Sequence, residues 1–107
     1  MATEPLLIRT TFERQEHAEE IAGLLLQRRL VACAQIEGPM ESMYWWKDEI
    51  VKTVEFVLSV KTVADLYPEI ESLLLREHPY DVPEIIALPL VRVSSSYLAW
   101  MRKELEA

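Results

Sequence analysis

The chain has 107 residues, half of them apolar and 27% charged, an ordinary balance for one small globular domain spanning residues 1–107. Eleven Lys and Arg against eighteen Asp and Glu give a net charge of −7. This acidity argues against nucleic acid and anionic membranes as partners, because both are bound through clustered cations. The only cysteine, Cys33, cannot form an internal disulfide or a four-thiolate zinc site within one chain.

The first half of the chain is predicted to run strand, helix, strand. Residues 5–11 form a strand with apolar residues at its centre. Residues 13–29 place apolar side chains at helical spacing, with acidic residues early and basic residues late, which suits the helix dipole. A second extended segment covers residues 31–46, and we expect a β-bulge where Gly38-Pro39 interrupts it.

A hairpin and a second helix are predicted next. Residues 49–61 form a third strand with four apolar residues on one face, and residues 47–50 close its hairpin with the preceding strand. Thr62 is positioned to cap a helix that carries Leu66, Ile70, Leu73 and Leu74. That helix must end by His78-Pro79, because the residue before a proline disfavours helical geometry.

The last part of the chain adds one strand and one short helix. Residues 84–93 form the fourth strand, and Ser94 or Ser95 caps the final helix. The order is therefore βαββαβ with an extra C-terminal helix. Two such crossovers in a chain of this length predict an α+β fold of the ferredoxin-like kind.

Two features predict an assembly of several subunits. The central strands are about 13 residues long, roughly 40 Å at ~3.3 Å per residue, so their hairpin should project from a body with a radius of gyration of about 13 Å. The neighbours Trp45 and Trp46, and likewise Ile85 and Ile86, point to opposite faces of the sheet. A sheet that is apolar on both faces needs a second cover, which is either another subunit or the C-terminal helix.

Four blocks of the sequence stand out by their order and spacing: residues 30–34 (LVACA), Tyr44-Trp45-Trp46, residues 78–89 (HPYDVPEIIALP) and residues 97–100 (YLAW). Together they resemble the CutA family of divalent-cation tolerance proteins. The resemblance covers about residues 5–105. It implies a ferredoxin-like subunit with a long central β-hairpin, assembled as a PII-like homotrimer. It also implies a cytoplasmic, non-enzymatic role in divalent metal ion tolerance and copper binding.

The resemblance further implies a metal site at Cys33, Glu55 and His78. A thiolate and an imidazole suit copper or another divalent cation, and a carboxylate can complete the ligand set. Each residue also has a structural interpretation. Cys33 lies in an apolar segment, His78 stands at a helix end, and Glu55 alternates with strand residues that would let it pair with a cation. We expect no metal to be required for folding.

The functional alternative is a PII-like module that senses a small ligand between subunits. Residues 44–48 and 78–84 combine aromatic and polar side chains that would line such a cleft, although aromatic residues also serve packing at interfaces. A purely structural interaction protein is a third interpretation. We do not expect an enzyme, because the chain has no nucleophile elbow and its two isolated glycines cannot form a phosphate loop. The first residues also lack the features of a signal peptide.

Overall fold

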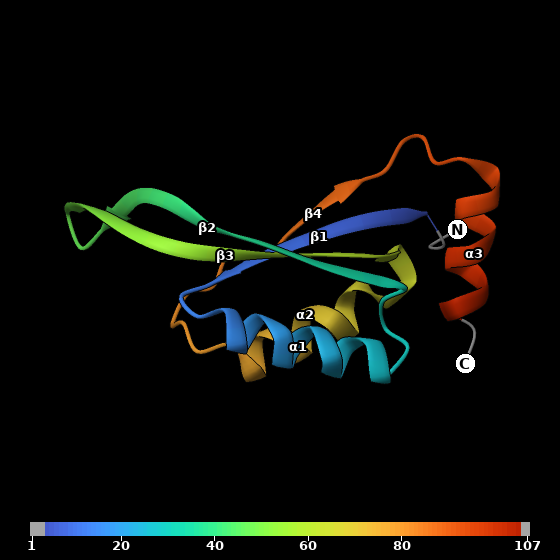
Figure 1. Ribbon diagram of the computed structural model, residues 1–107, viewed down its shortest axis with the longest axis horizontal. Helices are drawn as coiled ribbons and strands as arrows, with labels where there is room; N and C mark the ends of the chain where they lie inside the picture. Colours follow the sequence, from blue (N-terminus) through green and yellow to red (C-terminus); the bar gives the residue numbers. More distant parts are fainter. Residues whose placement is uncertain (1–3, 106–107) are drawn as a thin grey trace.

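The computed structural model describes residues 4–105, which form a four-stranded antiparallel sheet and three α-helices (Figure 1). The strands are β1 (Pro5–Phe12), β2 (Cys33–Trp46), β3 (Glu49–Val63) and β4 (Ile86–Pro89). The helices are α1 (Gln15–Gln27), α2 (Tyr67–Glu77) and α3 (Ser95–Leu105), with a 3-10 turn, η1, at Ala64–Leu66. The sheet order is β2-β3-β1-β4. The predicted ferredoxin-like fold with an added C-terminal helix is confirmed.

Helices α1 and α2 cover one face of the sheet, and the core lies between them (Figure 1). On β1, Ile8 and Phe12 are buried. Ile8 stands opposite Val60 in the antiparallel register, so both side chains point toward the helices. The helices contribute residues spaced three or four positions apart, which keeps one apolar stripe against the sheet. These are Ala18, Ile21, Ala22 and Leu25 of α1 and Ile70, Leu73 and Leu74 of α2.

The β2–β3 hairpin projects well beyond the helices (Figure 1). Its strands are 14 and 15 residues long, and the molecule extends 44 Å along its longest axis. The turn contains only Lys47 and Asp48, with φ values of 51° and 66°. Two consecutive residues of positive φ make the tight turn whose twist matches the flanking strands. The predicted projecting hairpin is confirmed, and its turn is two residues shorter than predicted.

A β-bulge interrupts the hairpin at the predicted place. The pairing register shifts between Glu37 and Met40, so Gly38 and Pro39 together oppose one residue of β3, Phe56. Gly38 has a φ of 149°, a conformation that L side chains rarely adopt. Because the bulge adds one residue to β2, Glu37 and Met40 lie on the same face of the sheet although they are three positions apart. From Met40 onward the side chains of β2 again alternate in step with those of β3.

Two sequence predictions were wrong in detail. Thr62 does not cap α2. It lies within β3, fully buried, where its hydroxyl donates a hydrogen bond to the Leu30 carbonyl at 2.6 Å. The fourth strand covers only Ile86–Pro89 of the predicted 84–93, and it ends at Pro89 because its partner β1 begins at Pro5. The Leu90 N–H still donates to the Pro5 carbonyl, and beyond that point β1 has no further residues to pair with.

The second face of the sheet is largely uncovered by the described residues of the chain. On β4, Ile86 and Leu88 stand opposite Arg9 and Leu7, and each is 45% exposed. Helix α3 stands at the end of the sheet remote from the hairpin tip, where Met101 is buried (Figure 1). Its Tyr97 lies against Lys61, which shares this face with its partner Leu7, so the helix covers only that end of the face. Within residues 4–105, no helix is both long and apolar enough to cross a membrane.

Candidate functional site

His78 follows the last residue of α2, and hydrogen bonds at both ring nitrogens tie it to β1 and to the next loop. Its Nδ1 accepts a hydrogen bond from the Tyr80 N–H at 3.1 Å. Its Nε2 lies 2.9 Å from the Thr11 carbonyl oxygen and 3.1 Å from the Thr10 hydroxyl. A carbonyl only accepts, so Nε2 must carry the proton of a neutral imidazole. Both nitrogens are thus engaged, and the ring presents no free lone pair to a metal.

Burial keeps the His78 ring neutral. Only 8% of the residue is exposed, and the ring stacks on Phe12 with centroids 4.3 Å apart. Loss of water around the ring lowers the pKa of His78 below its ordinary value, although the hydrogen bond to Thr11 and the charge of Glu55 oppose this shift. The neutral form is the one that the surrounding hydrogen bonds require.

This environment predicts an acid-dependent loss of stability. The unfolded chain protonates its histidine near pH 6.5, but the folded state resists protonation to a lower pH. The unfolded state then binds more protons, so the free energy of unfolding should fall as the pH drops below about 6.5 and level off below the folded pKa. Urea titrations between pH 7.5 and 5 measure this slope. The slope should shrink in His78→Asn and persist in His17→Asn, and equal slopes in all three proteins would contradict the assignment.

Glu55 is linked to the His78 loop by a tyrosine. Its carboxylate, on β3, accepts a hydrogen bond from the Tyr80 hydroxyl at 2.8 Å, and the residue is only 7% exposed. Burial, reinforced by this hydrogen bond and the nearby carboxylate, raises the pKa of the Tyr80 phenol far above its ordinary value. Tyr80 therefore remains a protonated donor. Within residues 4–105, no Lys or Arg forms an ion pair with Glu55.

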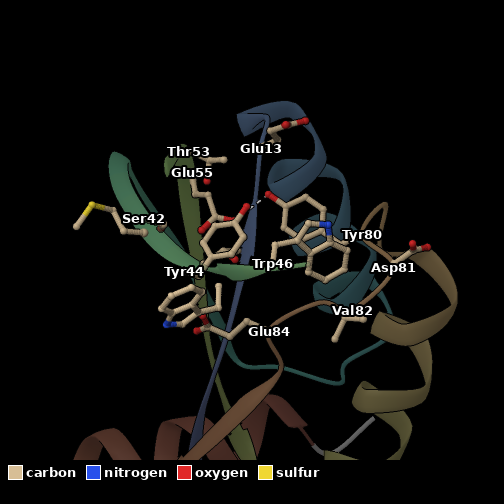
Figure 2. A pocket seen from close by; sticks show the side chains of 13 residues that line it. Glu13, Ser42, Tyr44, Trp46, Thr53, Glu55, Tyr80, Asp81, Val82 and Glu84 are labelled. Carbon is tan, nitrogen blue, oxygen red and sulfur yellow. Dashed lines mark hydrogen bonds between the residues drawn. The ribbon is translucent and has the colours of Figure 1, made fainter. Parts of the chain in front are cut away.

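Glu55 and Tyr80 lie in the wall of an open cavity of about 670 Å³ between the hairpin and the loop after α2 (Figure 2). The close-up shows Tyr44 and Trp46 from the hairpin beside Tyr80, with the dashed hydrogen bond to Glu55 between them. The lining contains four carboxylates and four aromatic rings. These are Glu13, Glu55, Asp81 and Glu84, and Tyr44, Trp45, Trp46 and Tyr80.

The structure joins two of the three predicted metal ligands and separates the third. Glu55 and His78 are connected through Tyr80, whereas Cys33 stands opposite Lys61, six residues further along β3. That separation is roughly 20 Å at ~3.3 Å per residue. Cys33 is half-buried, with its sulfur 4.0 Å from the Lys61 ammonium. Across residues 4–105, no three His, Cys, Asp or Glu side chains gather where they could hold one metal ion.

The sequence predicts residues 44–48 and 78–84 as the lining of a ligand cleft, but it does not predict the long-range contacts that Tyr80 and His78 make. Tyr80 bonds a residue 25 positions away, and His78 bonds Thr11 across 67 positions. Neither contact leaves a periodic signal in the sequence. Glu13 also lines the cavity, although in the sequence it is simply the first of several acidic residues near a helix start. The one local cue is the spacing of His78 and Tyr80, because a side chain can accept a hydrogen bond from a backbone N–H two residues further along the chain.

Comparison with known proteins gives one consistent family. A family model described as "CutA1 divalent ion tolerance protein" matches residues 6–104. A divalent-cation tolerance protein CutA from Thermus thermophilus is 39% identical over 93 residues, covering 87% of this chain and 90% of that protein. A probable cutA homolog from Encephalitozoon cuniculi is 40% identical over 97 residues, covering 91% and 84%. The crystal structure of a CutA1 from Shewanella sp. SIB1 aligns over both full chains with a TM-score of 0.93 and 36% identity.

Proposed function

Because the chain belongs to the CutA1 family of divalent ion tolerance proteins, we propose that it is a cytoplasmic, non-enzymatic protein of divalent metal tolerance that acts as a homotrimer. The observation that carries the proposal is the family match across residues 6–104, since it spans all of β1 and α3 but one residue each and every element between them. Relatives across this length are named for divalent-cation tolerance.

Exposed apolar side chains support the trimer. The open sheet face presents Ile86 and Leu88, and the projecting hairpin presents an apolar stripe of its own. Trp45 and Ile50 are directly opposite each other in the hairpin register and are 72% and 65% exposed. A monomer rarely leaves contiguous apolar surface of this kind in water. Burial of these surfaces between copies of the chain explains why the hairpin projects with apolar side chains exposed in a single chain.

Copper is the cation that we propose for the assembled protein, with Cys33, Glu55 and His78 as its ligands. One subunit does not bring the three residues together, so the site requires ligands from two subunits. His78 must also release one of its present hydrogen bonds to bind a metal, because both ring nitrogens are engaged. The proposed site is therefore tied to assembly and to a local rearrangement.

Native mass spectrometry with substoichiometric Cu(II) tests both parts. We expect a trimer of about 37 kDa, three times 12.4 kDa, with one tightly held copper per chain. Cys33→Ser and His78→Asn should lose that copper and stay trimeric, whereas His17→Asn should retain it. A monomer would overturn the trimer. Copper retained by Cys33→Ser would overturn the ligand set, since Cu(II) binds most nitrogen sites with some affinity.

A second candidate function is small-ligand sensing in the manner of the PII proteins, and the cavity beside Glu55 favours it. Its volume of about 670 Å³ falls within the range of small-molecule sites, and its lining mixes aromatic rings with a few polar groups. A ligand held there would contact the hairpin, the sheet and the loop after α2 together. Ligand binding could then be transmitted to whatever the hairpin contacts.

A further inference from the structure

We propose that the cavity beside Glu55 binds an aliphatic polyamine, a flexible chain that carries two or more ammonium groups. This inference rests on the second candidate function, small-ligand sensing, and names its ligand class. It shares Glu55 with the proposed copper site but uses neither of the other two proposed ligands, because Cys33 lies elsewhere and His78 does not line the cavity.

The charge of the cavity points to a cation. Its lining includes four carboxylates and, among the described residues, no Lys, Arg or His. Glu55 is the informative member, because a glutamate residue that is only 7% exposed normally has a cationic partner or several donors for its carboxylate. Among residues 4–105, its side chain has one hydrogen-bond partner, the neutral Tyr80 hydroxyl. An ammonium group bound here would supply the missing positive charge.

An unpaired polar atom lies in the same wall as Glu55. The Thr53 hydroxyl oxygen is buried and has no hydrogen-bond partner within residues 4–105. Thr53 precedes Glu55 by two positions on β3, so both side chains point to the same face of the sheet. An ammonium has three donors and no acceptor, so one such group can serve the carboxylate and the hydroxyl together.

The aromatic rings favour an organic cation over a metal ion. Tyr44, Trp46 and Tyr80 lie around the cavity, and the electron-rich face of an aromatic ring attracts an ammonium (Figure 2). A metal ion would instead need three or more ligands converging on one point, and the described residues contain no such group. The methylene groups of an amine also cover apolar ring surface, which a hydrated ion does not.

The extent of the cavity favours a cation with separated charges. Its hairpin wall runs from Ser42 to Trp46, roughly 13 Å at about 3.3 Å per residue. Carboxylates also come from separate parts of the chain. Glu13 follows β1, Glu55 lies on β3, and Glu84 precedes β4. A single compact ammonium could meet only part of this lining, whereas a polyamine can place one charge at Glu55 and another near Glu13 or Glu84.

Isothermal titration calorimetry with spermidine tests the proposal at an ionic strength of about 0.15 M, where the Debye length of about 8 Å screens diffuse attraction to an acidic protein. We expect one spermidine per chain. Glu55→Gln should weaken binding about tenfold or more, because it removes the buried charge. Trp46→Leu should weaken it by roughly two- to tenfold through loss of a ring face. Trp46 is 42% exposed in one subunit, so this variant keeps the test open if Glu55→Gln misfolds.

The matched control is Glu69→Gln, which removes the same charge from the exposed first turn of α2 and should leave the affinity unchanged. Equal weakening by Glu69→Gln and Glu55→Gln would overturn the site. A parallel thermal-shift panel of spermidine, ATP and glutarate distinguishes failure of the polyamine proposal from failure of small-ligand sensing. Stabilisation by one of these anions and not by spermidine would overturn the polyamine and retain ligand sensing. No stabilisation by any of the three would overturn both.

Discussion

Replacing Gly38 with alanine should lower the free energy of unfolding by roughly 2–4 kcal/mol. Gly38 combines a φ of 149° with close packing under the bulge. A Cβ at this position would lie 2.6 Å from a ring carbon of Phe56 and 3.1 Å from the Glu55 carbonyl oxygen. Alanine therefore adds backbone strain and a steric clash, and relief of either would shift the hairpin. Urea denaturation measures the change, with the parent and the variant compared at one protein concentration.

Gly23→Ala is the matched control because it makes the same chemical change within α1. A Cβ at Gly23 would meet nothing within 4 Å, and alanine is a better helix former than glycine. This variant should therefore raise the free energy of unfolding by about 0.5–1 kcal/mol. If Gly38→Ala lowers the free energy of unfolding and Gly23→Ala raises it, the constraint lies at the bulge. A Gly38→Ala protein as stable as the parent would show that the hairpin rearranges freely there, contrary to the tight contact with Phe56.

The order of the elements could be predicted because it depends on local patterns. The helical spacing in α1, the alternation along β3 and the position of Gly38-Pro39 are each visible within a few residues. The errors occurred where a distant partner decides the outcome. Thr62 matches the sequence pattern of a helix cap, but the Leu30 carbonyl, 32 positions away, holds its hydroxyl within β3. The end of β4 was likewise set by where β1 begins.

The candidate site was harder to predict because tertiary contacts assemble it. Residue types alone suggested that Cys33, Glu55 and His78 bind a metal. In the sheet register, Cys33 of β2 pairs with Lys61, which lies six positions from Glu55 along β3. The spacing of Cys33 and Glu55 in the sequence does not reveal this separation. The structural interpretation of His78 as a helix cap was also incomplete, because its backbone N–H bonds Leu74 while its ring bonds β1. The cavity depends on a two-residue turn and a bulge that together set the position of Tyr44 and Trp46.

Phe12→Ala should destabilise the protein by about 3–5 kcal/mol, the usual cost of deleting a fully buried phenylalanine. The ring has no exposed surface and ends β1 at the point where the sheet meets the His78 loop. Its removal leaves a cavity between the sheet and the helices, where close packing cannot fully recover. Phe56→Ala is the control, because Phe56 stands directly opposite in the register and is only partly buried. Its loss should cost less, and equal costs would contradict the central position assigned to Phe12.

The same variant tests the link between the core and the candidate site. The stacked Phe12 ring helps exclude water from the His78 imidazole, and that exclusion is the main cause of its lowered pKa. Phe12→Ala should therefore raise the pKa of His78 toward its ordinary value, whereas Phe56→Ala should leave it lowered. An NMR titration of the His78 ring protons measures both. If the pKa of His78 stays unchanged in Phe12→Ala, the other groups that bury the ring and the Tyr80 N–H donated to Nδ1 hold it in its neutral form without the Phe12 ring. The loop that carries Tyr80 to Glu55 would then be fixed independently of the core beneath it.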